Sequence, residues 1–179
     1  MHEVETKILN VNSGSLGERL RALGAAQVLD TRLRVDWFWP QGTVAGQEPW
    51  FLRIRTDAQN RSEVTWKGRS KILGAARKHP ELNLAVSDPE KLAKIFESLG
   101  LEKYAHQEKD RVSWTYQDWR FDLDQYPGMP GYLEIEGKDE THVQQAIALL
   151  GLSDHETSSQ GERILIQKRY GLNWYDMRF

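Results

Sequence analysis

Charged and apolar side chains alternate along many short segments of this 179-residue chain. In residues 50–55, for example, Arg53 and Arg55 alternate with Leu52 and Ile54. Successive side chains on a β-strand point to opposite faces, so this alternation predicts a strand with one charged face and one apolar face. The same reasoning predicts strands over residues 3–9, 28–39, 63–68, 81–86, 108–114, 120–124 and 132–137.

Other segments repeat apolar residues every three or four positions, which predicts amphipathic helices. The clearest covers residues 89–99, where Ser87-Asp88-Pro89-Glu90 has a capping spacing with Pro in the first turn, and Gly100 is a stop after it. The remaining expectations are helices over residues 15–23, 143–150 and 159–170, the first with a capping box over 15–18, and a basic loop over 68–79.

Strand–helix–strand units recur along the chain. Two of them place a helix that ends in Leu-Gly before a polar strand containing tryptophan, and no linker separates them. We therefore expect a single domain over residues 1–179, built from two pseudo-repeated halves. The apolar strand faces need helices to cover them, which predicts an α+β fold. In it, a mostly antiparallel sheet closes into a barrel with the helices packed outside.

Composition narrows the range of functions. The formal net charge is −2, so the chain as a whole does not attract nucleic acid or an anionic membrane. There is no cysteine, which excludes disulfides, a thiolate nucleophile and cysteine-ligated zinc. No stretch matches a membrane span or a signal peptide. We expect a cytoplasmic protein without nucleic-acid or membrane partners, either a monomer or a homodimer.

The charged strand faces are sorted by sign. The acidic positions are Glu3, Glu5, Glu81, Asp122, Asp124, Glu134 and Glu136. The basic positions are Lys7, Arg53, Arg55, Lys67, Lys109 and Arg111. If helices cover the apolar faces, these charges face the lumen of the closed sheet. Confined carboxylates should raise at least one carboxyl pKa unless a cation neutralises them.

Such a lumen suits one kind of ligand. Convergent carboxylates bind hard divalent cations such as Mg²⁺ or Mn²⁺. Arginine and lysine side chains bind phosphate oxygens, arginine in bidentate fashion. The pattern therefore predicts a site for a metal–polyphosphate complex. Taken alone, the charged strand over residues 3–9 would also be consistent with a solvent-exposed sheet edge.

The same residues resemble a known family. Glu3-x-Glu5-x-Lys7 is similar to the ExExK signature of the CYTH superfamily, the triphosphate tunnel metalloenzymes. That superfamily includes class IV adenylyl cyclases, thiamine triphosphatases and inorganic triphosphatases. The other charged pairs follow in family order over almost the whole chain. The resemblance implies an eight-stranded antiparallel tunnel, a basic lining for triphosphate, and Mg²⁺ or Mn²⁺ on the terminal glutamates.

The chain departs from the family pattern at two points. Where members often carry Arg-x-Glu-x-Glu, this chain has His79 in the arginine's place and Asn83 in the second glutamate's. Arg77 or Lys78 are alternative substitutes for that arginine. The turn before Glu134 is Pro-Gly-Met-Pro-Gly rather than a cyclase-like Leu-Gly-x-Phe, which weakens the case for cyclase activity.

Other chemistries have less support. The sequence lacks the glycine patterns of P-loop and dinucleotide-binding sites, and its five histidines are scattered. The seven tryptophans would suit the stacking of nucleobases. Several alternate with the charged positions, however, so we expect them to pack in the core under the helices.

The sequence thus predicts a metal-dependent phosphohydrolase acting on inorganic triphosphate or on an organic triphosphate such as ATP or thiamine triphosphate. The six basic residues would bind the phosphates and stabilise the transition state. One metal ion would be held by Glu3, Glu5, Glu134 and Glu136, and a second, which activates water, by Asp122, Asp124 and Glu81. Conversion of ATP to cyclic AMP and pyrophosphate is the close alternative, and a non-catalytic polyphosphate- or nucleotide-binding module is the other.

Overall fold

The computed structural model describes residues 2–74 and 76–179, except for the side chains of His2 and Glu3. Its strands are β1 (His2–Ile8), β2 (Ala26–Pro40), β3 (Trp50–Thr56), β4 (Ser62–Gly68), β5 (Lys71–Leu73), β6 (Ala76–Val86), β7 (Leu101–Tyr116), β8 (Trp119–Gln125), β9 (Tyr132–Gly137), β10 (Thr157–Ser158) and β11 (Asp176–Met177). Its helices are α1 (Ser13–Ala22), α2 (Pro89–Ser98), α3 (Glu140–Leu149) and α4 (Glu162–Leu165), which continues as a π-helical turn, η1 (Ile166–Tyr170).

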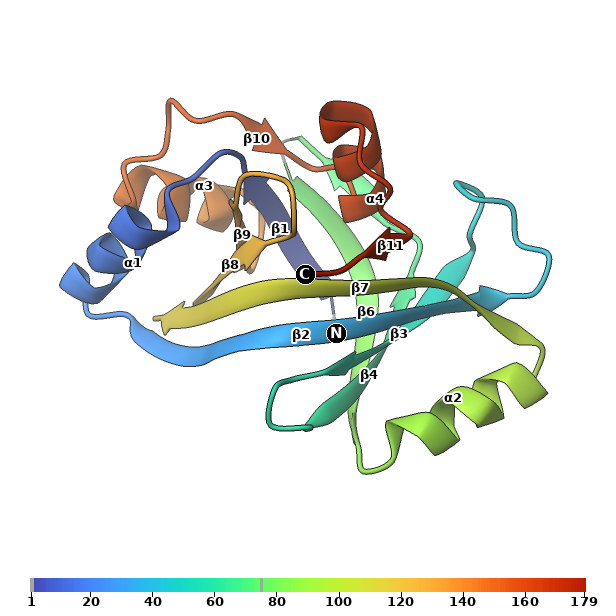
Figure 1. Cartoon of the computed structure of the whole chain (residues 1–179). Coiled ribbons are helices and arrows are strands. Elements are labelled where there is room, and N and C mark those ends of the chain that lie inside the picture. The colour runs from blue at the N-terminus through green and yellow to red at the C-terminus, as the bar shows by residue number, and fades with distance from the viewer. Residues whose placement is uncertain (1, 75) are drawn as a thin grey trace.

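The main feature is an antiparallel sheet that closes on itself. Eight strands follow one another in the order β1, β9, β8, β7, β2, β3, β4, β6, and β6 pairs back with β1. The long strands β2 and β7 run side by side across the molecule (Figure 1). The predicted α+β fold with a closed antiparallel sheet is confirmed.

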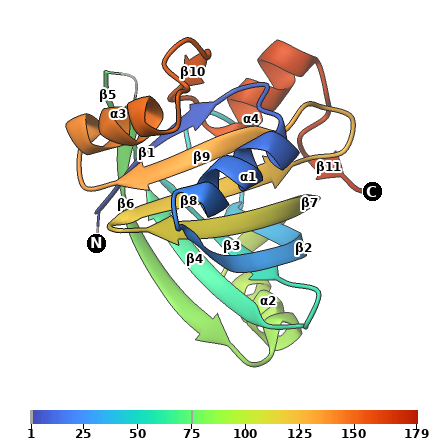
Figure 2. The ribbon, with the colours of Figure 1, turned by 90° about the vertical axis from the view of Figure 1, so that its left-hand side faces the viewer.

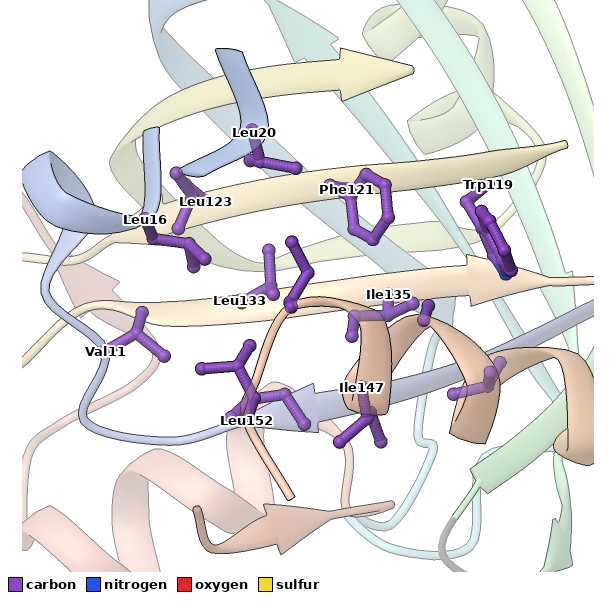
Figure 3. Close-up of a cluster of buried hydrophobic side chains, with 14 of the residues drawn as sticks. Val11, Leu16, Leu20, Trp119, Phe121, Leu123, Leu133, Ile135, Ile147 and Leu152 are labelled. Carbon is purple, nitrogen blue, oxygen red and sulfur yellow. The ribbon is translucent and has the colours of Figure 1, made fainter. Parts of the chain in front are cut away.

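Helices cover the outer face of the ring, as predicted. Helices α1 and α3 lie over β1, β8 and β9 (Figure 2). Leu20 of α1 and Ile147 of α3 pack against Phe121, Leu133 and Ile135 of the sheet (Figure 3). Each fully buried side chain of this kind contributes roughly 1.5–3 kcal/mol relative to an exposed one. This apolar layer fixes the opposite face of the same strands toward the interior.

Two smaller apolar clusters complete the core. Phe96 of α2 packs on Phe38 and Ile54, across β2 and β3. At one end of the ring, Leu165 and Ile166 of the C-terminal helix join the cluster that contains Trp37, Tyr132 and Trp174. The C-terminal segment therefore covers part of one opening of the ring.

Residues 68–79 do not form the predicted basic loop. They contribute β5 and the start of β6, and β6 pairs with β5, β1 and β4 in turn. The basic, glycine- and alanine-containing composition favoured a loop, but backbone pairing on both sides of β6 outweighs that preference. Arg77 and His79 therefore lie on a strand of the ring and not in a loop.

The helix ends follow the predictions in part. Helix α2 begins at Pro89, as predicted, and the side chain of Asp88 caps it by accepting from the amide of Lys91. Helix α1 begins earlier than predicted, because Asn12 caps it by accepting from the amide of Ser15. Helix α4 begins at Glu162, later than predicted. Within the described ranges, the helices are too short or too polar to cross a membrane.

Candidate functional site

The ring encloses a cavity of about 790 Å³. Since side chains alternate along each strand, every second residue of the ring points inward. Most of the predicted site residues line the cavity, namely Glu5, Arg53, Arg55, Lys67, Glu81, Arg111, Asp122, Glu134 and Glu136. Lys7, Lys109 and Asp124 lie deeper and are at most 1 % exposed. The side chain of Glu3 lies outside the described part of the structure.

Two carboxylates from opposite ends of the chain lie next to each other on the sheet. Glu5 of β1 is the register partner of Glu136 of β9, and Arg77 and Arg120 flank this pair on the neighbouring strands. Like charges directly opposite each other destabilise a sheet. A cation between the two carboxylates would relieve that repulsion. The prediction that Glu5 and Glu136 lie together is confirmed, and the direct pairing of β1 with β9 is what brings them together.

Glu5, Glu134 and Glu136 form the acidic side of the cavity. Lysine and arginine side chains already neutralise part of its negative charge. Lys7 Nζ donates to Glu134 Oε1 at 2.7 Å and lies 3.6 Å from Glu5 Oε1, and Arg77 also donates to Glu5. Burial alone would raise a carboxyl pKa, but Arg77 and Lys7 hold the pKa of Glu5 below its ordinary value. Lys7 and Arg111 do the same for the pKa of Glu134.

Arg111 lies at the centre of a buried ion-pair network. Its Nη1 donates to Asp122 Oδ2 at 2.5 Å, and its Nε and Nη2 donate to the two oxygens of Asp124, each at 2.6 Å. Lys109 and Tyr132 also donate to Asp124 Oδ2. A metal ion at Asp124 would have to displace one of these donors. The structure thus shows Asp122 and Asp124 orienting Arg111, and their assignment as metal ligands stays a prediction.

The basic side of the cavity lies across the ring, on β3 and β4. Arg55 Nη2 donates to Glu63 Oε1 at 2.6 Å, and Arg53 Nη2 lies 3.9 Å from Glu81 Oε1. Burial, together with the charges of Arg53 and Arg111, lowers the pKa of Arg55. A site where guanidinium groups repel one another is stabilised by an anion placed between them.

The structure separates the roles of His79 and Arg77. Both occupy alternate positions of β6, and Arg77 lines the cavity. His79 is 3 % exposed, and its Nε2 lies 2.8 Å from Lys67 Nζ and 3.2 Å from Glu81 Oε2. Arg77 therefore supplies the cation on the cavity wall, while His79 positions Lys67. Lys78, between them, points to the other face of the strand.

Glu162 is a buried acidic residue that sequence reasoning missed as a site residue. It projects from α4 and accepts from Lys109 Nζ at 2.6 Å, Tyr132 Oη at 2.7 Å and Tyr126 Oη at 3.0 Å. In the sequence it resembled an ordinary helix-capping residue. The pairing with Lys109 holds its pKa below the ordinary value despite burial.

We expect this network to make stability depend on pH. The folded-state pKa of Glu162 is lowered, so its stabilising effect is present above its unfolded pKa of about 4.5 and is lost as pH falls through the folded pKa. Glu162→Gln should lower the free energy of unfolding by about 2 kcal/mol at pH 7, and this difference should shrink below pH 4. Thermal unfolding of both proteins from pH 7 to pH 3 measures it. A difference that does not change with pH would contradict the assignment.

Carboxylates are the ligands that Mg²⁺ and Mn²⁺ prefer, so the acidic side fits such an ion. Asp124, Glu134 and Glu162 each offer an oxygen within 4.8 Å of the others, but Lys109 already donates to Asp124 and Glu162 there. Glu5 and Glu136 provide a second pair of facing carboxylates on the cavity wall. These carboxylates therefore suit a divalent cation. Among the described residues, there are no thiolates and no clustered imidazoles, the ligands that softer metals prefer.

Comparison with known proteins agrees with this geometry. The CYTH domain profile matches residues 1–161. The chain belongs to the CYTH domain family. Among curated proteins, none matches the sequence of this CYTH protein.

Several solved structures share the CYTH fold of this chain at low sequence identity. A proposed adenylate cyclase from Vibrio parahaemolyticus is 16 % identical with a TM-score of 0.77, and the match covers 93 % of this chain and 98 % of that one. The PH1819 protein from Pyrococcus horikoshii is 20 % identical with a TM-score of 0.74, covering 93 % and 99 %. HpAC1 from Hippeastrum, a proposed adenylyl cyclase with a dominant triphosphatase activity, is 13 % identical with a TM-score of 0.65, covering 96 % of each chain.

Proposed function

We propose that this CYTH protein is a divalent-metal-dependent phosphohydrolase that acts on a triphosphate. The observation that carries the proposal is that basic residues of β3 and β4 face carboxylates of β1 and β9 across one cavity. A triphosphate bound to a divalent cation presents oxygens to the first group and the cation to the second. The triphosphatase activity of the Hippeastrum relative supports this reaction class.

In the proposed reaction, water attacks the terminal phosphorus. The bond from that phosphorus to the bridging oxygen breaks, and the bridging oxygen leaves with the remaining two phosphates. Arg53, Arg55 and Lys67 would hold the phosphate chain and stabilise the negative charge that develops on its oxygens. Glu5, Glu134 and Glu136 would hold Mg²⁺ or Mn²⁺, which supplies positive charge and lowers the pKa of bound water.

A substrate screen tests this function. Inorganic triphosphate, ATP and thiamine triphosphate are each incubated with Mg²⁺ or Mn²⁺, and both phosphate and cyclic AMP are measured. We expect metal-dependent release of phosphate from at least one of them. Tight binding without turnover would instead identify a non-catalytic polyphosphate-binding module.

Cyclisation of ATP is the second candidate. Aromatic side chains, including Trp37 and Phe51, line the cavity beside the basic residues, and a nucleobase would pack on them. In that reaction the ribose 3′-hydroxyl attacks the α-phosphorus and pyrophosphate leaves. Cyclic AMP as the main product of the same screen would favour the cyclase over the phosphohydrolase.

Divalent metal should stabilise the folded protein through the carboxylate pair. A ligand that binds only the folded state adds about 2.7 kcal/mol at 100 times its Kd, so Mg²⁺ or Mn²⁺ should raise the melting temperature of the wild type. Glu136→Gln keeps the shape, removes one charge and should lose this rise. Glu97→Gln, on the exposed face of α2, is the matched control and should keep it. A metal-induced rise that survives in Glu136→Gln and in Glu5→Gln would refute the assignment.

A further inference from the structure

One part of the ring has a strand edge that no described strand covers. Residues 81–86 of β6 pair with β4 along one edge. Along the other edge, β1 pairs only with residues 77–80 in the described part of the chain. Figure 2 shows the lower part of β6 at the border of the sheet, beyond the N-terminal end of β1. The backbone groups of residues 82–86 along this side, here called the open edge of β6, can therefore pair with another strand.

The open edge of β6 lacks the features that usually protect a free strand. Proteins keep such edges from pairing with charged side chains, above all lysine, or with proline. Residues 82–86 read Leu-Asn-Leu-Ala-Val and contain neither. Leu82 is 63 % exposed and Leu84 is 68 % exposed, and both point away from the cavity that Asn83 lines. Exposed leucines beside an unprotected edge indicate an interface for another strand.

The open edge of β6 is complementary to a second copy of itself. Antiparallel pairing about a twofold axis at Leu84 places this residue opposite its own copy and places Leu82 opposite Val86. All pairs on the outer face are then apolar. On the inner face, Asn83 lies opposite Ala85, which brings no two charges together. Apolar cross-strand pairs of this kind stabilise a sheet.

The charges on either side of the open edge favour the antiparallel arrangement. Before it, Lys78 and its register partner on β5, Lys71, form a basic end. After it, Asp88 pairs with Lys91, and the exposed Glu90 in the first turn of α2 adds negative charge. Antiparallel pairing places the basic end of one copy beside the acidic end of the other, whereas parallel pairing would place like charges together.

We propose that this CYTH protein is a homodimer formed through the open edge of β6. Residues 82–86 of the two copies pair antiparallel and join the two rings into one continuous sheet. Main-chain hydrogen bonds hold the strands together, and the leucines and Val86 supply the apolar contact. Because the contact is the same surface on both copies, it closes after two chains. None of these residues binds phosphate or metal in the proposed function, so the homodimer is tested independently of it.

The mass of the protein in solution gives the first test. Sedimentation over a series of protein concentrations should show the mass of two chains at the higher concentrations. Leu84→Lys places two like charges opposite each other at the twofold axis and should raise the Kd of the dimer by about 100-fold or more. Leu99→Lys is the matched control, because Leu99 is 72 % exposed but lies at the end of α2 that is far from β6. It should leave this Kd within about twofold of the wild type.

A mixing experiment tests whether the occupant of the open edge is a second copy. Leu84→Glu alone should also dissociate the dimer, but mixing it with Leu84→Lys brings opposite charges together at the axis. The mixture should therefore form a heterodimer with a Kd within about tenfold of the wild type. Since Leu84 is exposed, each variant should fold, and thermal unfolding checks this. If Leu84→Lys does not fold, Leu82→Lys, which places its charge opposite Val86, decides the question.

Amide hydrogen exchange locates the contact on the chain. In the concentrated wild type, amides of residues 82–86 should exchange slowly, and they should exchange faster on dilution or in Leu84→Lys. A wild type that stays a monomer throughout the concentration series would overturn the proposal. A dimer that persists in Leu84→Lys, or one whose dilution leaves exchange at residues 82–86 unchanged, would also overturn it. Growth beyond two chains would contradict the closed twofold contact.

Discussion

Arg111→Met should lower the free energy of unfolding by about 3–5 kcal/mol, the usual cost of removing one partner from a buried ion pair. The reason is that Asp122 and Asp124, which are each 1 % exposed, would keep their charges without the guanidinium that binds them. The surrounding contacts raise the pKa of Arg111, so its charge is permanent in the folded protein. Denaturant unfolding at pH 7 measures the loss.

Arg32→Met provides the comparison for that experiment. Arg32 also forms a bidentate pair with a carboxylate, Asp110, but both side chains are 45 % exposed. Exposed pairs contribute at most about 1 kcal/mol, so this variant should unfold almost like the wild type. An equally small effect in both variants would show that the buried network does not stabilise the fold.

Arg55→Met should have the opposite profile, with a large effect on activity and a small one on folding. We expect kcat/KM for the preferred triphosphate to fall by about 100-fold or more, as for the loss of one preorganised group that stabilises transition-state charge. Folding should change little, because Arg53 and Arg111 repel the Arg55 charge and lower its pKa in the folded protein. Steady-state kinetics and thermal unfolding of the same samples separate the two effects.

Arg34→Met is the control for Arg55. Arg34 belongs to the adjacent strand β2, is exposed, and donates to Asn60 outside the cavity. It removes the same charge from the protein without touching the cavity lining, so activity should stay within twofold of the wild type. If Arg55→Met also keeps full activity, the basic face of β3 does not bind the substrate.

Local alternation was enough to predict which face of a strand is charged. On β8 and β9, Phe121 and Ile135 pack under the helices, while Asp122 and Glu134 point into the ring. This works because alternation is a property of the strand itself. The same local rule identified nine of the residues that line the cavity, without any information on which strands pair.

The features that the sequence did not predict depend on how distant segments dock. In the sequence, Glu162 showed only the pattern of a helix cap. Its burial could not be predicted, because it depends on where α4 packs against the ring. The choice of ion-pair partners, such as Arg77 with Glu5, depends on the register of β1 against β6. The sequence signal for a buried acid was the pair Tyr126 and Tyr132, because a buried tyrosine hydroxyl needs a hydrogen-bond acceptor. Both hydroxyls donate to Glu162.

Some tryptophans pack in the core under the helices, and others line the cavity. Trp114 and Trp119 pack in the outer core, as predicted for these residues. Trp37 and Trp174 instead line the cavity, because β2 and the C-terminal segment carry them inward at one end of the ring. Burial tendency predicts that a tryptophan is covered, but not which side of the sheet covers it.

The first strand of the ring also constrains the order of folding. Strand β1 leaves the ribosome before either of its neighbours, β6 and β9, and Lys7 meets Glu134 only after 127 further residues. Contacts of such long sequence separation form slowly, because the chain loses entropy before they stabilise it. Until β9 arrives, β1 has an open edge, and Lys7 lacks the carboxylate of Glu134. The charged interior is therefore expected to be among the last parts of the molecule to assemble.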